Sequence, residues 1–179
     1  MFSLSQFNFL FNKTTTTTIM SFTDLIVESD LAEVAEIRID PVGGHRSLFS
    51  MKEFKAEDAI VGFMARATYD VPNYLTVQIS ENVHIELLPE CLECANHSCD
   101  PNCFFDTTRM ELMAINPIGK GEELTFFYPS AEWDMNQSFQ CLCGSKECIG
   151  SIQGAKHLSE EALNKYRFTD FIKSKLASK

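Results

Sequence analysis

The stretch that most constrains this chain is Asn96-His97-Ser98-Cys99-Asp100-Pro101-Asn102. Pro101 has a fixed φ and no N–H, and it disfavours the helical region for the residue before it. Asn, Ser and Asp side chains hydrogen-bond the backbone in turns. These residues therefore predict a turn with a rigid second half, which presents an amide, an imidazole and a thiol close together. Taken alone, the stretch is also compatible with a solvated surface loop.

Composition limits the kind of protein and its partners. The chain has 179 residues, of which 45% are hydrophobic, and this suits one domain with a small appendage. The formal net charge of -10 argues against binding to nucleic acid and to anionic membranes, and it allows a basic partner. No apolar run is long enough to span a bilayer.

The seven cysteines form two groups, within residues 91–103 and 141–148. Without a convincing secretory signal, they favour thiols or metal ligands over a disulfide framework, and a nuclear or cytoplasmic protein over a secreted one. Cys141, Cys143 and Cys148 suit zinc, which takes four ligands in a closed structural site. The fourth ligand must come from elsewhere, and the candidates are Cys91, Cys94, Cys99, Cys103 and His157.

The chain is expected to be mostly β. Residues 1–20, with five consecutive threonines, are typical of a disordered tail, and Met20 is an alternative start. Short strands are predicted at 25–27, 35–39, 47–50, within 59–67 and 74–85, and at 122–128, with a hairpin over 104–115. The one helix is predicted near the end, capped by Ser159, with Leu163, Tyr166 and Phe168 on one face.

Together, three segments resemble the signature of SET-domain protein methyltransferases with a cysteine-rich post-SET tail. Asn-His-Ser-Cys-x-Pro-Asn lies at 96–102, Gly-Glu-Glu-Leu-Thr-x-x-Tyr at 121–128, and Cys-x-Cys-x4-Cys at 141–148. The resemblance covers roughly residues 42–154. It implies several small β-sheets and a pseudoknot, in which the segment ending at Tyr128 threads under a loop and lies beside Asn96-His97. The expected parts are a SET domain at 21–134, a post-SET zinc segment at 135–155 and a C-terminal helical extension at 156–179.

The resemblance also implies an activity and site residues. Family members transfer a methyl group from S-adenosylmethionine to a lysine side chain of a protein, so we expect a basic protein or peptide substrate, a histone tail among the candidates. Tyr128 would be catalytic, and Phe126, together with Trp133, would line the lysine channel. A Phe at 126 goes with the addition of more than one methyl group. The remaining implied roles are cofactor binding by Arg46, Asn96 and His97, and zinc binding by Cys99, Cys141, Cys143 and Cys148.

Departures from the family pattern keep other interpretations open. The glycine-rich cofactor loop reads Gly43-Gly44-His45-Arg46-Ser47-Leu48-Phe49, so His45 and Ser47 replace two glycines. This departure motivates the main alternative, a non-catalytic SET-fold module that binds zinc. Thiol chemistry by Cys99 and His97 is a weaker alternative, because residues two apart on a turn rarely form a nucleophile–base pair.

Overall fold

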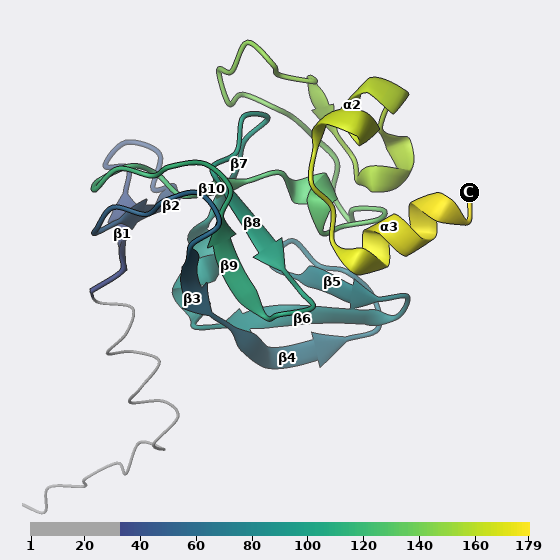
Figure 1. The fold of residues 1–179 in the computed structure, drawn as a ribbon, viewed down its shortest axis with the longest axis horizontal. Coiled ribbons are helices and arrows are strands. Elements are labelled where there is room, and N and C mark those ends of the chain that lie inside the picture. Colours follow the sequence, from purple (N-terminus) through teal and green to yellow (C-terminus); the bar gives the residue numbers. More distant parts are fainter. Residues whose placement is uncertain (1–32) are drawn as a thin grey trace, which may run out of the picture.

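The computed structural model describes residues 33–179, which form several small sheets and a few short helices (Figure 1). The predicted tail at 1–20 and the predicted strand at 25–27 lie outside the described residues. None of the helices in the described part of the chain is long and apolar enough to cross a membrane. The prediction of a mostly β fold with several small sheets is confirmed.

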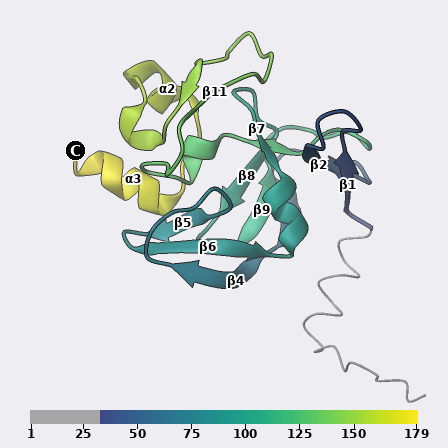
Figure 2. The same cartoon turned by 180° about the vertical axis from the view of Figure 1, so that it is seen from behind.

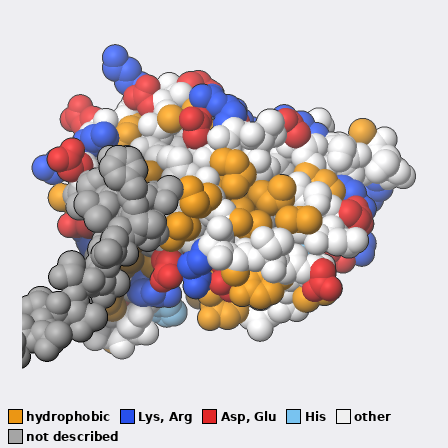
Figure 3. Space-filling view, turned by 90° about the horizontal axis from the view of Figure 1, so that it is seen from below, with side chains coloured by type: hydrophobic (Ala, Val, Ile, Leu, Met, Phe, Trp, Pro, Cys, Tyr) orange, Lys and Arg blue, Asp and Glu red, His pale blue; other side chains and the backbone are white. Residues whose placement is uncertain are grey.

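Two of the sheets flank the centre of the molecule. Strand β1 (Ala35–Ile39) pairs antiparallel with β2 (Arg46–Ser50). The other sheet has the order β4-β6-β5 and consists of β4 (Met64–Tyr69), β6 (Val83–Leu88) and β5 (Val77–Ser80). Figure 3 shows the molecule from below, where hydrophobic side chains gather between charged ones.

The central sheet has the order β3-β9-β8-β10-β7. Its strands are β3 (Ala59–Gly62), β9 (Glu111–Ala114), β8 (Cys103–Asp106), β10 (Thr125–Phe126) and β7 (Asn96–His97). Strand β10 runs parallel to both β7 and β8, and these two strands are joined by the turn at 98–102. Strand β10 therefore lies between β7 and β8, which the turn at 98–102 connects. The predicted pseudoknot requires this arrangement, which is uncommon among protein folds.

The predicted strand at 122–128 is much shorter in the structure. Asn102 accounts for this, because its Nδ2 donates to the Glu123 carbonyl (2.8 Å) and its Oδ1 accepts from the Thr125 amide (2.9 Å). The turn thus takes backbone groups that a longer strand would have paired in the sheet. After Phe126 the chain enters a 3₁₀ turn, η2 (Tyr128–Ser130), where Pro129 prevents further strand pairing.

The C-terminal part differs from the single predicted helix. Ser159 caps α2 (Glu160–Lys165) as expected, its side chain accepting from the Ala162 amide at 3.3 Å. The helix ends before Tyr166, and Thr169 caps a second helix, α3 (Asp170–Ala177). The other short elements are η1 (Glu90–Cys94), η3 (Ala155–His157), and the paired strands β11 (Phe139–Gln140) and β12 (Ser151–Ile152).

The helices have their own small core. Phe127, Ala155, Phe168 and Ile172 form this buried cluster, separate from the main core under the sheets. Figures 1 and 2 show α2 and α3 at the end of the molecule opposite β1 and β2. Phe126 and Tyr128 pack in the main core, and Phe127 between them packs in the core of the helices. One segment therefore contributes to both cores.

Candidate active site and metal centre

His97 connects the signature turn to the segment that ends at Tyr128. Its Nδ1 accepts a hydrogen bond from the Tyr128 backbone N–H at 3.2 Å, so the ring proton lies on Nε2, which faces the Cys99 sulfur at 3.3 Å. The Ser98 amide donates to the Phe126 carbonyl at 3.0 Å. Burial lowers the pKa of His97 to about 4, so the ring is neutral at pH 7. The predicted proximity of Asn96-His97 and Tyr128 is confirmed.

Asn96 ties the glycine-containing loop to the sheet. Its Nδ2 lies within hydrogen-bond distance of the Arg46 carbonyl (3.1 Å), the Ser47 hydroxyl (2.8 Å) and the Glu123 carboxylate (3.0 Å). Ser47, one of the two departures from the glycine pattern, is thus part of this network. Gly44 has a φ of +69°, a conformation that favours glycine.

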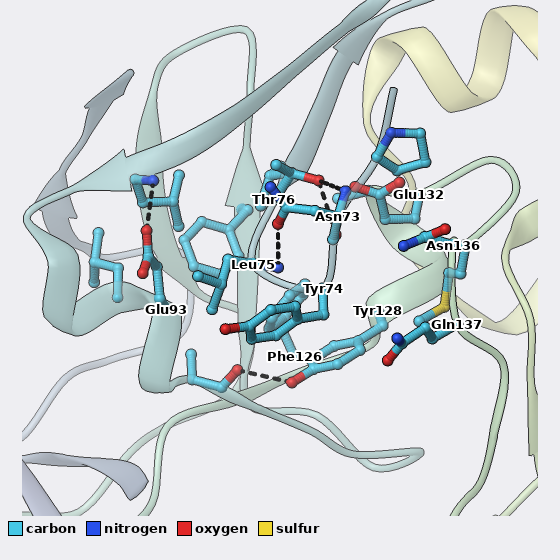
Figure 4. A pocket seen from close by; sticks show the side chains of 18 of the residues that line it. Asn73, Tyr74, Leu75, Thr76, Glu93, Phe126, Tyr128, Glu132, Asn136 and Gln137 are labelled. Atoms are coloured by element: carbon cyan, nitrogen blue, oxygen red, sulfur yellow. Dashed lines mark hydrogen bonds between the residues drawn. The ribbon is translucent and has the colours of Figure 1, made fainter. Parts of the chain in front are cut away.

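Tyr128 and Phe126 form the aromatic floor of a cavity of about 190 Å³ (Figure 4). Their ring centroids are 4.7 Å apart, and Phe105 packs edge-on against Phe126, also at 4.7 Å. The Tyr128 hydroxyl donates to the Ala95 carbonyl at 3.4 Å, a long hydrogen bond. Burial raises the pKa of this hydroxyl to about 12, so Tyr128 is protonated at neutral pH.

The charged groups of this cavity are all acidic. Among the described residues that line it, Glu93 and Glu132 carry the only carboxyl side chains, and none is Lys, Arg or His. Glu132 is buried beside His84, with 3.8 Å between its carboxylate and the imidazole Nδ1, and burial raises the pKa of its carboxyl group. Nothing in the sequence pattern singled out Glu132, because its partner lies on a distant strand.

Phe139 is a second residue that sequence reasoning missed. It lies two positions before Cys141 and lines the cavity from the cysteine-rich segment. Its ring centroid is 6.0 Å from that of Tyr128 and 5.7 Å from the His97 ring. The segment that carries the cysteines therefore also contributes a wall of the cavity.

Trp133 requires a correction, since it does not line this cavity. Its side chain packs against the C-terminal cluster, and the Lys175 ammonium lies 5.3 Å from its ring centroid. Its neighbour Glu132 lines the cavity, whereas the Trp133 side chain is directed to the cluster formed by the helices. Arg46 lies at the start of β2, and its side chain is exposed. The hydrogen bond with Asn96 is made by the backbone carbonyl of Arg46.

The four predicted zinc ligands lie together. The sulfur atoms of Cys99, Cys141, Cys143 and Cys148 are all within 4.8 Å of one another, and those of Cys99 and Cys141 are 3.8 Å apart. Tetrahedral zinc with Zn–S bonds of about 2.3 Å separates its sulfurs by about 3.8 Å. The donor set and its spacing therefore fit a closed zinc site with four cysteine ligands.

The other candidate ligands lie elsewhere. Cys103 is buried in β8, where its thiol donates to Asn102 Oδ1 at 3.3 Å, and His157 pairs with Asp134 at 2.8 Å. The objection to a Cys99–His97 pair on grounds of geometry was wrong, because the two side chains do meet. Cys99 is nevertheless one of the four clustered thiols, so a bound zinc ion would occupy its sulfur, which is unfavourable for a nucleophile.

A residue of the C-terminal extension completes the surroundings of the cluster. The Tyr166 hydroxyl donates to the Cys99 carbonyl at 2.8 Å, and its ring stacks on Phe127 with centroids 3.7 Å apart. Sequence reasoning assigned Tyr166 to a helix face and missed this role.

Comparisons with known proteins agree with the motifs. The family model described as SET domain matches residues 15–129. Methyltransferase flvH of Aspergillus flavus is 42% identical over 108 residues, which are 59% of this chain and 60% of that protein. A histone-lysine N-methyltransferase of Aspergillus fumigatus, H3 lysine-4 specific, is 42% identical over 64 residues, 32% of this chain and 5% of the relative. The chain thus spans less than two thirds of the length of these relatives.

A solved structure shares the fold. It is KRYPTONITE in complex with mCHH DNA, an H3(1-15) peptide and SAH, and the match has a TM-score of 0.50 and 23% identity. The match covers 65% of this chain and 29% of that chain. At this identity the likeness concerns the fold alone.

Proposed function

The chain belongs to the SET-domain family, and from this premise we propose that it is a protein-lysine methyltransferase that uses S-adenosylmethionine. The observation that carries the proposal is that Phe126 and Tyr128, whose backbone amide is bound by His97, line one cavity whose charged side chains, among the residues that the structure describes, are acidic. The alternative is a SET-fold module that binds zinc and methylates nothing.

The cavity suits a lysine amine as methyl acceptor. The ammonium group must lose its proton before it can accept a methyl group, and its reference pKa is about 10.4. Glu93 is paired with Arg66 at 3.2 Å and Glu132 is buried beside His84, so the aromatic floor, which removes water and attracts alkylammonium groups, is the feature that suits an amine. Burial among apolar groups disfavours the charged form of an amine, and this favours release of the proton.

Tyr128 would orient the reacting groups. Its hydroxyl is held at the cavity by the Ala95 carbonyl and stays protonated at neutral pH, so the oxygen has lone pairs for the incoming amine or methyl group. Positioning of this kind supplies much of the rate when two reactants must be aligned. Phe126 has no hydroxyl to restrain a methylated amine, which supports addition of more than one methyl group.

The residues around Asn96 fit the amino-acid end of the cofactor. Arg46 has an exposed guanidinium for a carboxylate, and Asn96 Oδ1, which accepts no hydrogen bond from the described residues, can take an ammonium. Together with His97, these groups would hold S-adenosylmethionine, which supplies an electrophilic methyl group when bound. Zinc would be held by the four cysteines and would keep Phe139 at the cavity.

The substrate is proposed to be a basic protein or peptide, with a histone tail as the first candidate. The net charge of -10 supports a basic partner and opposes direct binding to nucleic acid or an anionic membrane. We also propose that the protein acts in the nucleus or the cytoplasm, where reducing conditions preserve a zinc site built from four thiolates.

The test is methyl transfer from labelled S-adenosylmethionine to core histones and to a cell extract, with products identified by mass spectrometry. We expect labelled lysine with more than one methyl group on some sites. Calorimetry with the cofactor runs in parallel. Cofactor binding without transfer to any protein would favour the non-catalytic module, and absence of both would refute the proposal.

A further inference from the structure

A second cavity, of about 170 Å³, lies between the signature turn and the C-terminal extension. Its walls come from the turn at 99–101, strand β8, the residues that follow β9, the region of η2 and residues 165–167. It shares no lining residue with the cavity at Tyr128, and none of the three residues proposed to hold the cofactor lines it. The second cavity is therefore distinct from the site proposed for methyl transfer.

The two cavities differ in the charge of their walls. Lys165 and Arg167 line the second cavity, and Asp100 is the one carboxylate among its described lining residues. The first cavity has carboxylates and no basic group. Charged ligands bind where the surrounding side chains carry the opposite charge. The second cavity therefore favours an anion, whereas the first favours an amine.

Each cation of the second cavity lies over an aromatic ring that also lines it. The guanidinium carbon of Arg167 is 4.6 Å from the centroid of the Phe104 ring, and Lys165 Nζ is 5.0 Å from the centroid of the Tyr166 ring. Such contacts restrain the two cations at the cavity wall. A guanidinium that lies over a ring keeps the N–H groups at its edge for hydrogen bonds.

Both cations also have an acidic partner outside the cavity lining. Arg167 Nη1 is 3.1 Å from the Glu57 carboxylate, and Lys165 Nζ is 2.9 Å from the Glu147 carboxylate. Exposed ion pairs of this kind are weak. Within the described part of the chain, Arg167 uses only Nη1 for hydrogen bonds. Its Nε and Nη2 groups remain, and such a pair of donors binds both oxygens of a carboxylate.

Ser130 provides an independent observation. It lines the cavity and is 2% exposed, and its hydroxyl has no hydrogen-bond partner among the described residues. Buried hydroxyl groups are normally paired, so an acceptor oxygen placed against Ser130 would remove an unfavourable feature. Pro101, Ile115 and Phe127 supply apolar surface in the same cavity. The lining thus suits a ligand with an acceptor head and an apolar body.

We propose that the second cavity is a binding site for a small carboxylic acid with an apolar body, such as an aromatic monocarboxylate. The Arg167 fork and the Ser130 hydroxyl bind the carboxylate, Lys165 supplies further positive charge, and the apolar walls cover the body of the ligand. Because Cys99 and Tyr166 line the same cavity, the ligand lies beside the hydrogen bond that joins the extension to the metal centre. The site does not depend on methyl transfer.

The first test is a titration of the full, zinc-loaded chain with benzoate, read by nuclear magnetic resonance. Benzamide is the control, because it has the same ring and nearly the same shape without the negative charge. We expect benzoate to bind about tenfold more tightly than benzamide. Equal affinities would show that the cavity does not recognise an anion, and absence of benzoate binding would also overturn the proposal.

Variants then locate the site. Arg167→Met keeps an unbranched stem and removes the fork, and Arg109→Met is the matched control, since Arg109 pairs with Glu111 and does not line the cavity. Arg167→Met should lose about tenfold in affinity for benzoate and little for benzamide, with methyl transfer to core histones unchanged. Arg109→Met should bind benzoate like the wild type. Equal benzoate affinities in the two variants would exclude this cavity as the site.

Ser130→Ala separates ligand binding from folding. It removes an unpaired hydroxyl, so the free protein should unfold at the same denaturant concentration as the wild type or at a higher one. Its affinity for benzoate should nevertheless fall several-fold. Wild-type affinity for benzoate in Ser130→Ala would contradict the role of this hydroxyl in the proposed site.

Discussion

The central sheet and the cysteine-rich segment both line one cavity, but different forces hold them. Strands β8 and β9 bury Phe105 and Leu112 completely. In the cysteine-rich segment, by contrast, Leu142 is 93% exposed and the only strand pairing is the two-residue match of β11 with β12. No residue from 139 to 150 is buried, and a stretch with so little apolar burial cannot offset its own loss of conformational entropy. The comparison indicates that metal binding replaces a hydrophobic core there.

Loss of one zinc ligand should have the largest effect. Cys143→Ser should abolish stoichiometric zinc binding, because structural zinc sites need all four ligands and their binding free energy is folding free energy. Methyl transfer should also be lost, since Phe139 would no longer be held at the cavity. Elemental analysis and activity assays measure both effects, and circular dichroism should show that the β-sheet signal survives.

Cys91→Ser is the matched control, because Cys91 lies outside the cluster. It should retain one equivalent of zinc. Full zinc content in Cys143→Ser would show that the site is wrongly assigned, and the contrast between the two regions would fail.

Tyr128→Phe tests the sheet side of the cavity alone. The ring and its packing are kept, so zinc content and cofactor affinity should be unchanged, and the loss of the long hydrogen bond to the Ala95 carbonyl should lower stability only slightly. Removal of one positioned polar group should lower the rate of methyl transfer on the order of 10²-fold. Tyr69→Phe, which removes a hydroxyl away from the cavity, should retain full activity. Equal rates for the two variants would exclude a catalytic role for Tyr128.

Asn96→Ala should have an intermediate effect. The half-buried Ser47 hydroxyl and the Glu123 carboxylate would lose a shared donor, and the net contribution of a hydrogen bond of this kind is about 0.5–1.5 kcal/mol. We expect weaker S-adenosylmethionine binding by calorimetry, with zinc content unchanged. Asn116→Ala removes a hydrogen bond to the Pro101 carbonyl, outside the cofactor loop, and serves as the control. An unchanged dissociation constant in Asn96→Ala would move the cofactor site elsewhere.

Tyr166→Phe should have the smallest effect and tests the link between the two regions. The stacking on Phe127 is kept, while the hydrogen bond to the Cys99 carbonyl is lost. We expect the free energy of unfolding to fall by about 0.5–1.5 kcal/mol, and zinc to be removed faster by a chelator. Chemical denaturation and a chelator competition assay measure these changes. Zinc release at the wild-type rate would show that the extension does not support the metal site.

Local patterns predicted much of the fold. The alternation in Ala35–Ile39 and the turn signals between Phe104 and Glu111 indicated strands that the structure contains. The predictions failed where a distant group intervened. The strand at 122–128 was shortened by the side chain of Asn102, and the expected terminal helix ends at Lys165, before the extended Tyr166 and the second cap at Thr169. The proposed division at residues 20, 134 and 155 stays a prediction.

The sequence by itself determined the chemistry available to this protein: three thiols with metal-ligand spacing, a rigid turn with an imidazole, and a family signature ending in Tyr128. Only the tertiary structure brought Cys99 to the other thiols, set the His97 ring against the Tyr128 amide, and turned Trp133 away from the cavity. It also added Phe139 and Glu132, which no motif marks. The physical reason is that residue spacing specifies contacts within a turn or strand, whereas contacts between distant segments depend on how β10 enters between β7 and β8.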